Sequence, residues 1–166
     1  GPHFTTFGMK RGLEFTVEMF RRCVMTDEPY DVPQAETWSD DPWYADQDSR
    51  TFVPQTGHRV LRTGTASGRL IGGNLCTLNL LQGTPFMPDI RGSILMLEDD
   101  SGSNAQTFDR DLQSLLHQPG ADEIRGLVIG TFQRSSSVSP EDLEQIISTK
   151  RALAGVPVVA DASFGH

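Results

Sequence analysis

Ser93-Ile94-Leu95-Met96-Leu97-Glu98-Asp99 is a nearly continuous apolar run that ends abruptly in acidic residues. A run of this kind is typical of a strand that is covered on both faces of a sheet. Two further apolar runs follow, at residues 127–129 and 156–160. The segments between the runs have helical character, so the order is strand, helix, strand, helix, strand. This order predicts an α/β domain whose parallel strands are joined by right-handed crossovers.

Each segment between the apolar runs carries its own helix signal. Residues 139–153 begin with Ser139 as an N-cap and Pro140 at the first helical position, followed by two acidic residues that face the positive end of the helix dipole. Residues 104–117 place their apolar side chains on one side of a helix. These side chains are Phe108, Leu112, Leu115 and Leu116.

The region before these strands is less regular. Short strands are predicted at residues 51–53 and 58–61, with a turn at residues 56–57 between them. These strands and the glycine-rich segment that follows them make the expected sheet mixed rather than purely parallel. We therefore expect the α/β domain to span residues 51–166, with residues 1–50 as a lead-in.

The lead-in combines a helix with an unusual loop. Residues 9–25 carry apolar side chains at helical spacing. The following residues, up to 50, form a loop rich in proline and acids that contains both tryptophans, Trp38 and Trp43. A tryptophan exposes a large apolar area, so a polar loop seldom carries two without a purpose. Either the tryptophans pin a surface loop to the body, or the loop lines a ligand cleft or an interface, and the sequence favours neither.

Composition and charge exclude several classes of protein. A chain of 166 residues corresponds to one domain. Its 14 basic and 22 acidic residues give a net charge of -8, which argues against a nucleic-acid polymer as partner. No apolar run approaches the roughly 20 residues that a membrane-spanning helix needs. The opening residues, Gly1-Pro2-His3-Phe4, lack the pattern of a signal peptide.

Cysteine and histidine usage points to a cytoplasmic protein without a metal centre. Cys23 and Cys76 are far apart in the sequence and match no metal-binding spacing. We expect both to be small buried side chains in a reducing cytosol. The four histidines are scattered, and none belongs to a cluster with the spacing of metal ligands. The sequence therefore predicts no metal site.

Chemical groups converge at one edge of the predicted sheet. The carboxyl ends of parallel strands lie together, and here they deliver Glu98-Asp99, Gly130-Thr131 and residues 161–166, which include His166. A histidine whose ring is oriented by a carboxylate is the base half of a nucleophilic triad. The alternative is that Glu98 is a solvated strand end or helix cap, and that His166 is a frayed residue.

The sequence offers no nucleophile to complete such a triad. The strand-to-helix elbow Gly-x-Ser-x-Gly is absent from the chain. Ser67, Ser101, Ser103 and Ser163 all lack an elbow setting. The chain thus contains a candidate base and a candidate orienting carboxylate, without a serine to activate.

A second motif lies at Gly72-Gly73-Asn74, where two glycines let the backbone approach another group closely. Asn74 is a suitable N-cap and Gly83 a suitable C-cap, which predicts a short helix over residues 75–82. The motif lacks the Lys-Ser/Thr of a phosphate-binding loop, so tight packing of strand against helix is the favoured interpretation. Non-catalytic alternatives are a small-molecule binder that uses this turn and an interaction module that uses the tryptophan loop.

Five motifs taken in order resemble the LD-carboxypeptidase and microcin C immunity family of serine peptidases. They are Trp38-Ser39-Asp40-Asp41, Gly72-Gly73-Asn74-Leu75, Gly83-Thr84-Pro85-Phe86-Met87-Pro88, Ile94-Leu95-Met96-Leu97-Glu98-Asp99 and Phe164-Gly165-His166. The acidic loop with its tryptophan is more similar to the microcin-immunity branch. The resemblance covers nearly the whole chain, and it is to the C-terminal domain alone of a two-domain family.

This resemblance implies a fold, a reaction and a set of site residues. The fold would be a swivelling β/β/α domain, and members are commonly cytoplasmic homodimers that need no metal or cofactor. Glu98 and His166 fall on the glutamate and histidine of a Ser-Glu-His triad, whose serine lies on the N-terminal nucleophile domain that this chain lacks. The chain alone would therefore be inactive.

The reaction implied by the resemblance is hydrolysis of an amide next to a free carboxylate. One branch trims D-alanine from murein tetrapeptides in peptidoglycan recycling, and the other cleaves an aspartyl nucleotide, which confers resistance to the antibiotic microcin C. Trp38, Asn74, Asp99 and Arg110 are candidate substrate-binding residues. The chain departs from the microcin branch after Asp99, because no basic residue follows before Arg110.

Overall fold

A computed structural model describes residues 4–165 of the chain. The chain divides into two compact units, Gly1–Gly57 and His58–His166, and each is described by itself. The second unit contains a five-stranded mixed sheet with helices, so the predicted α/β class is confirmed.

The sheet of the second unit has the strand order β3-β7-β6-β5-β4. Strands β4, β5, β6 and β7 are parallel, and β3 is antiparallel to β7. The strands are β3 (Arg59–Arg62), β4 (Arg69–Asn74), β5 (Ser93–Glu98), β6 (Gly126–Thr131) and β7 (Val158–Gly165). The helices are α2 (Leu75–Asn79), α3 (Ala105–Leu115) and α4 (Pro140–Thr149), with short 3-10 turns η2 (Ala121–Glu123) and η3 (Arg151–Leu153).

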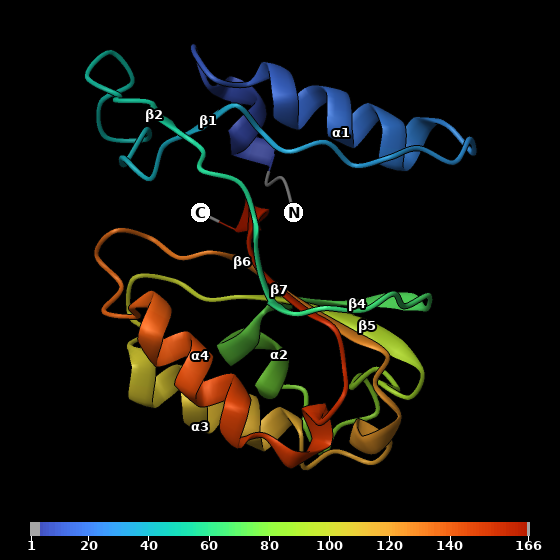
Figure 1. The fold of residues 1–166 in the computed structure, drawn as a ribbon. Helices are drawn as coiled ribbons and strands as arrows, with labels where there is room; N and C mark the ends of the chain where they lie inside the picture. The colour runs from blue at the N-terminus through green and yellow to red at the C-terminus, as the bar shows by residue number, and fades with distance from the viewer. Residues whose placement is uncertain (1–3, 166) are drawn as a thin grey trace. The chain divides into compact units, whose positions relative to one another are not determined.

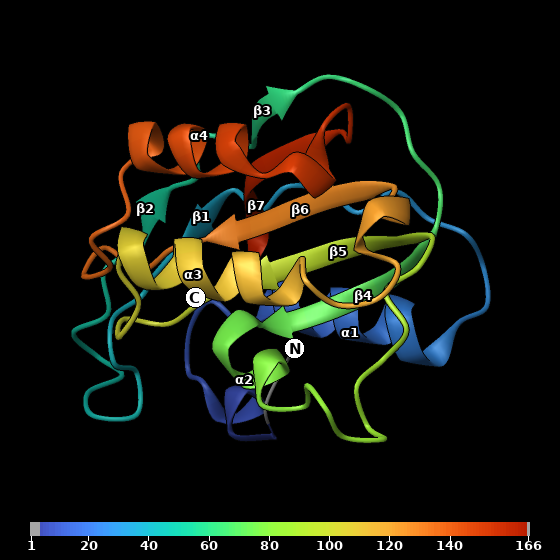
Figure 2. The ribbon, with the colours of Figure 1, turned by 90° about the horizontal axis from the view of Figure 1, so that it is seen from below.

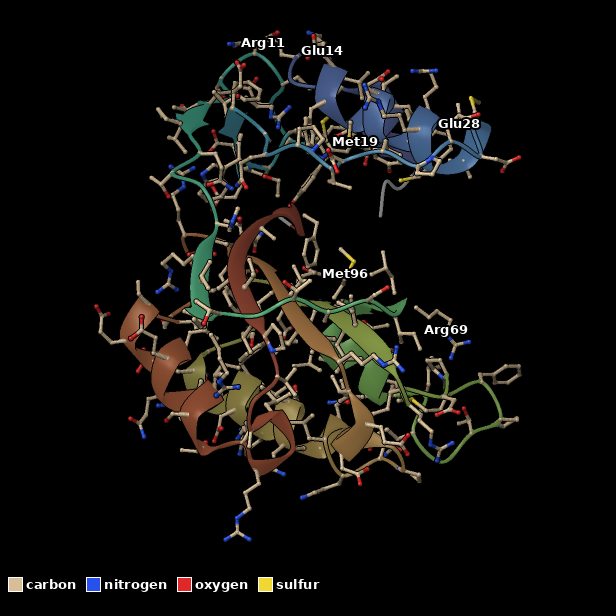
Figure 3. The ribbon with its side chains drawn as sticks, turned by 45° about the vertical axis from the view of Figure 1, so that its right-hand side comes forward. Arg11, Glu14, Met19, Glu28, Arg69 and Met96 are labelled. Atoms are coloured by element: carbon tan, nitrogen blue, oxygen red, sulfur yellow. The ribbon has the colours of Figure 1, made fainter. Side chains whose placement is uncertain are left out.

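Helices α2, α3 and α4 all cover the same face of the sheet (Figures 1 and 2). The core lies between that face and the helices, where Leu95, Leu97 and Phe108 are fully buried. Burial alternates along β5, and Met96 projects from the face opposite the helices (Figure 3). The residues of β5 that face the helices are fully buried, and those on the other face are partly buried. Parallel strands of a sheet with helices on one side bury every second residue most deeply.

The N-cap predicted at Ser139 is present, and α3 also has an N-cap. The side chain of Asn104 accepts a hydrogen bond from Thr107 N and caps α3. Ser139 caps α4 through a capping box with Asp142, in which each side chain bonds the backbone N–H of the other residue. Helix α4 ends at Thr149 rather than at 153, because Lys150 leaves the helical conformation with φ -84° and ψ 103°.

Replacing Ser139 with alanine is expected to lower the free energy of unfolding by about 1 kcal/mol, because it removes the N-cap. The Ser139 side chain and then its backbone N–H donate hydrogen bonds that lower the pKa of Asp142. A depressed folded-state pKa stabilises the fold above the pKa of the unfolded chain, and this stabilisation is lost as pH falls through the folded value. In urea unfolding, the wild type should therefore have a higher free energy of unfolding than Ser139→Ala at neutral pH, and this difference should become smaller in acid. A constant difference across this range would contradict the capping box as its cause.

The first unit contains η1 (Phe4–Gly8), α1 (Glu14–Met25), β1 (Thr37–Trp38) and β2 (Val53–Pro54). The helix predicted from residue 9 begins later, because Gly12 has φ 73°, outside the range of a right-handed helix. Arg50 is the buried cation of this unit: its Nη1 donates to Arg11 O, and its guanidinium lies 4.7 Å from the centroid of the Phe52 ring. Burial lowers the pKa of Arg50.

Two further expectations differ from the structure. The strands predicted at residues 51–53 and 58–61 do not pair with each other, since β2 pairs with β1 and β3 pairs with β7. Cys23 and Cys76 are free thiols, as expected, but both are exposed rather than buried. Within residues 4–165, no helix has the length and apolarity to cross a bilayer.

Candidate active site at the carboxyl edge of the sheet

Four parallel strands end at one edge of the sheet and define the candidate site. Strand β4 ends at Asn74, β5 at Glu98, β6 at Thr131 and β7 at Gly165. Asn74 and Glu98 are direct partners in the β4–β5 register, so their side chains start from adjacent positions. The predicted meeting of the ends of β5, β6 and β7 is thus present within residues 4–165.

Glu98 is half-buried against the end of β7. A methyl group built on Gly165 would lie 3.0 Å from Glu98 Cβ and 3.3 Å from Glu98 Oε2. One built on Gly130 would lie 2.5 Å from the Phe164 carbonyl oxygen and 3.1 Å from Glu98 Cβ. The Phe164-Gly165 segment therefore passes directly beside the glutamate, and side chains at these two glycines would push it away.

The predicted partner of Glu98, His166, lies outside the described residues. The structure follows its motif as far as Gly165, whose φ is 92°, a value that favours glycine. The Phe-Gly part of the motif is thus placed next to the glutamate. The role of His166 stays a prediction from the sequence.

Asn74 joins the ends of β4 and β5. Its side-chain oxygen accepts a hydrogen bond from Thr77 N at 3.0 Å and caps α2. Its Nδ2 donates to Asp99 Oδ1 at 3.3 Å, and Asp99 is only 1% exposed. This carboxylate fixes Asn74 from within the protein rather than from the surface.

Gly72 and Gly73 lie within β4, and the close approach at Gly72 is to strand β5, not to a helix as the favoured interpretation predicted. A methyl group on Gly72 would lie 1.7 Å from the carbonyl oxygen of Met96, so β4 and β5 can approach only with glycine at this position. Helix α2 is shorter than predicted and ends at Asn79, although Gly83, with φ 75°, still ends the turns that follow it.

The other two candidate binding residues, Arg110 and Trp38, belong to other elements than these strand ends. Arg110 is an exposed residue in the middle of helix α3, which follows β5 in the chain. Trp38 is half-buried in β1 of the first unit, where it pairs with Val53. Trp43 packs edge-on against the ring of Tyr44 at 6.2 Å in the same unit.

One cluster could offer ligands to a metal ion, which the sequence did not predict. Cys76, Asp99 and Asp100 each place one ligand atom within 4.8 Å of the others. Burial and the charge of Asp99 raise the pKa of the Cys76 thiol, which keeps it protonated. Metal binding requires the thiolate, so the raised pKa disfavours Cys76 as a ligand.

The pair Arg59 and Asp161 was not predicted from the sequence. Arg59 Nε donates to Asp161 Oδ2 at 2.5 Å, and a second nitrogen of Arg59 contacts Glu144 on α4. Asp161 has φ 59° and is the single non-glycine residue with positive φ in the part of the chain that the structure describes. Aspartate tolerates this conformation better than most residues, which was the one signal available in the sequence.

Comparisons with known proteins agree with this architecture. Residues 67–166 match the sequence profile described as "LD-carboxypeptidase C-terminal domain". "Putative carboxypeptidase YocD" of Bacillus subtilis is 48% identical over the whole chain, which covers 51% of that protein. An MccF-like protein from Bacillus anthracis has a solved structure with a TM-score of 0.95 and 46% identity over the whole chain and 51% of the other.

A more distant solved structure contains a ligand. Microcin C7 self-immunity protein MccF, in complex with aspartyl sulfamoyl adenosine, has a TM-score of 0.75 and 25% identity over 97% of this chain and 50% of its own. The chain thus spans about half the length of the relatives it matches.

Proposed function

The chain belongs to the LD-carboxypeptidase C-terminal domain family, and from this premise we propose that it is the C-terminal half of a serine carboxypeptidase. The other half would carry the nucleophilic serine, and the two halves together would hydrolyse an amide next to a free carboxylate. The single observation that carries this proposal is the position of Glu98 at the carboxyl edge of the sheet, beside the Phe164-Gly165 segment.

The proposed mechanism divides the triad between the two halves. His166 takes the proton from the serine hydroxyl as the serine attacks the amide carbonyl carbon. The carboxylate of Glu98 orients the imidazole ring and stabilises the imidazolium that forms. His166 then protonates the leaving nitrogen as the C–N bond breaks, which leaves an acyl enzyme. Water, activated by the same histidine, hydrolyses this ester and regenerates the serine.

For the substrate we propose an aminoacyl nucleotide, with a murein tetrapeptide as the second possibility. The complex of MccF with aspartyl sulfamoyl adenosine supports the first choice. Trp38 would stack on the base, Asn74 would bond the aminoacyl group, and Arg110 would approach the phosphate. Asp99 would act through Asn74, because it is buried and bonded to that side chain. Assembly as a cytoplasmic homodimer is also proposed, following the family resemblance.

The test compares the 166-residue chain with the full-length protein that contains it. Both are assayed on an aspartyl nucleotide and on a murein tetrapeptide, with the released nucleotide or D-alanine measured by chromatography. We expect turnover by the full-length protein and none by the chain, because loss of a triad nucleophile costs about 10⁶-fold in kcat.

The control is a full-length variant whose elbow serine is replaced by alanine, which should match the chain. Clear turnover by the isolated chain would show that its own residues supply a nucleophile, and would overturn the division of the triad. A full-length protein that cleaves neither substrate would overturn the proposed reaction.

A further inference from the structure

The pairing between β6 and β7 is regular at first and then broken. Leu127 and Val128 face Val158 and Val159 in register. Between Val128 and Thr131, β6 advances three residues while its partners on β7 advance from Val159 to Gly165, six residues. Strand β7 therefore bulges outward just before it reaches the strand ends. A bulge of this kind bends a strand and redirects the residues that follow it.

Asp161 lies within this bulge and has the left-handed backbone conformation, with φ 59°. A non-glycine residue holds this conformation only when its surroundings require it, and such residues cluster at functional sites. The strand turns at Asp161, so the direction of residues 162–165 depends on this one position.

Arg59 holds the turn from the neighbouring strand. It belongs to β3, which pairs with β7, and its Cα partner is Ala160, next to the bend. Its Nε donates to Asp161 Oδ2 at 2.5 Å, and the two side chains are only 31% and 30% exposed. Glu144 on α4 contacts the same guanidinium at 3.4 Å, so Arg59 is fixed from two sides. On the other side of the bulge, Thr131 Oγ1 donates to Ala162 O at 3.3 Å.

After the bend, the end of β7 lies next to Glu98. Beyond it, Gly165 lies so close to Glu98 that an added methyl group would be 3.0 Å from Glu98 Cβ. A catalytic carboxylate must hold its partner to within about 0.5 Å of the productive geometry. A small change in the bend would therefore move the peptide that leads to His166 relative to the glutamate.

We infer that Arg59 and Asp161 are positioning residues, and that their ion pair sets the bend of β7 that brings the Phe164-Gly165 segment to Glu98. This inference rests on the proposed function, because it assigns the bend to the Glu98–His166 contact. Neither side chain touches the substrate or the reacting atoms in this account. Their effect reaches the reaction through the backbone of β7.

The test uses three variants of the full-length protein. Asp161→Ala removes the ion pair and the tolerance for positive φ, and it should lower kcat on the order of 10²-fold with little change in KM. Asp161→Asn keeps both an acceptor for Arg59 and the tolerance for positive φ, so it should recover most of that loss. Arg59→Gln breaks the same ion pair while leaving Asp161 in place, so it should lower kcat as well. It tests the inference even if Asp161→Ala fails to fold.

A spectroscopic measurement separates positioning from a loss of folded protein. A histidine N–H that bonds a carboxylate gives a proton resonance at unusually low field. We expect this resonance in the wild type, its loss in Glu98→Gln and in Asp161→Ala, and its return in Asp161→Asn. Arg91→Gln is the matched control, because Arg91 pairs with Glu123 in the loops before β5 and β6, and it should change neither the resonance nor kcat.

The outcomes distinguish this inference from the proposed function. If the Asp161→Ala and Arg59→Gln variants keep the wild-type kcat and the low-field resonance, the inference is overturned. The proposed Ser-Glu-His triad would not be affected by that result. Loss of kcat with a retained resonance, or a loss that Asp161→Asn does not recover, would also overturn it. A wild-type protein with neither activity nor the resonance would overturn the proposed function, and the inference with it.

Discussion

Replacing His166 with alanine in the full-length protein is expected to lower kcat by about 10⁶-fold, the scale at which a triad stops working as a unit. Without the imidazole, no group takes the proton of the serine or returns it to the leaving nitrogen. Glu98→Gln should cost less, on the order of 10⁴-fold, because the base remains but is oriented in the wrong tautomer. Substrate affinity should change little in either variant, since both act on the chemical step. Single-turnover release of the nucleotide measures both effects directly.

The matched control is His117→Ala. His117 is an exposed histidine just beyond α3, where its Nε2 lies 3.0 Å from the side-chain amide of Gln113. Its removal should leave kcat within twofold of the wild type. A His166→Ala protein that kept more than a hundredth of the wild-type kcat would show that another residue acts as the base.

Replacing Gly72 with alanine is expected to destabilise the second unit by about 3 kcal/mol or more, because the added methyl group would overlap the backbone of the neighbouring strand β5. That group would lie 1.7 Å from the Met96 carbonyl oxygen and 2.9 Å from Met96 Cα. These are backbone atoms of β5, so the overlap can be relieved only if the two strands separate. Urea unfolding of the chain, followed by circular dichroism, measures the loss.

Gly8→Ala provides the comparison, because a methyl group there would meet nothing within 4 Å. It should change the free energy of unfolding by no more than about 0.5 kcal/mol. A Gly72→Ala protein as stable as the Gly8→Ala protein would contradict the close approach of β4 and β5. In the full-length protein, any Gly72→Ala molecules that fold should also be less active. Separation of β4 from β5 would move Asn74, which lies two residues away and is proposed to bind the substrate.

The sequence was sufficient to predict the elements whose cause is local. These elements depend on residues close in sequence: they are the apolar run from Ser93 to Leu97, the Ser139-Pro140 helix start and the Asn74 cap. These rules need no knowledge of the rest of the chain. The abrupt end of the apolar run also predicted that Glu98 lies at the carboxyl edge, where the structure has it.

Features that depend on distant partners could not be predicted in this way. Asp161 bends β7 because Arg59, 102 residues earlier, is beside it, and nothing local to either residue signals the pair. The two short strands before residue 62 were expected near each other, but their partners lie in different units. The hydrogen bond that Asp99 accepts likewise comes from a distant residue, Asn74, which lies on another strand.

The position of β7 in the sheet has a consequence for synthesis on the ribosome. Strand β3 pairs with β7 alone, and β7 begins 96 residues after β3 ends, at 158 against 62. At about 5–20 residues per second, β3 emerges roughly 5–20 s before the strand it needs. During that interval the β6 edge is also unpaired, which leaves two open strand edges on a nascent chain. The sheet can therefore close only late in translation, and nascent chains that end before β7 should be the species that bind chaperones.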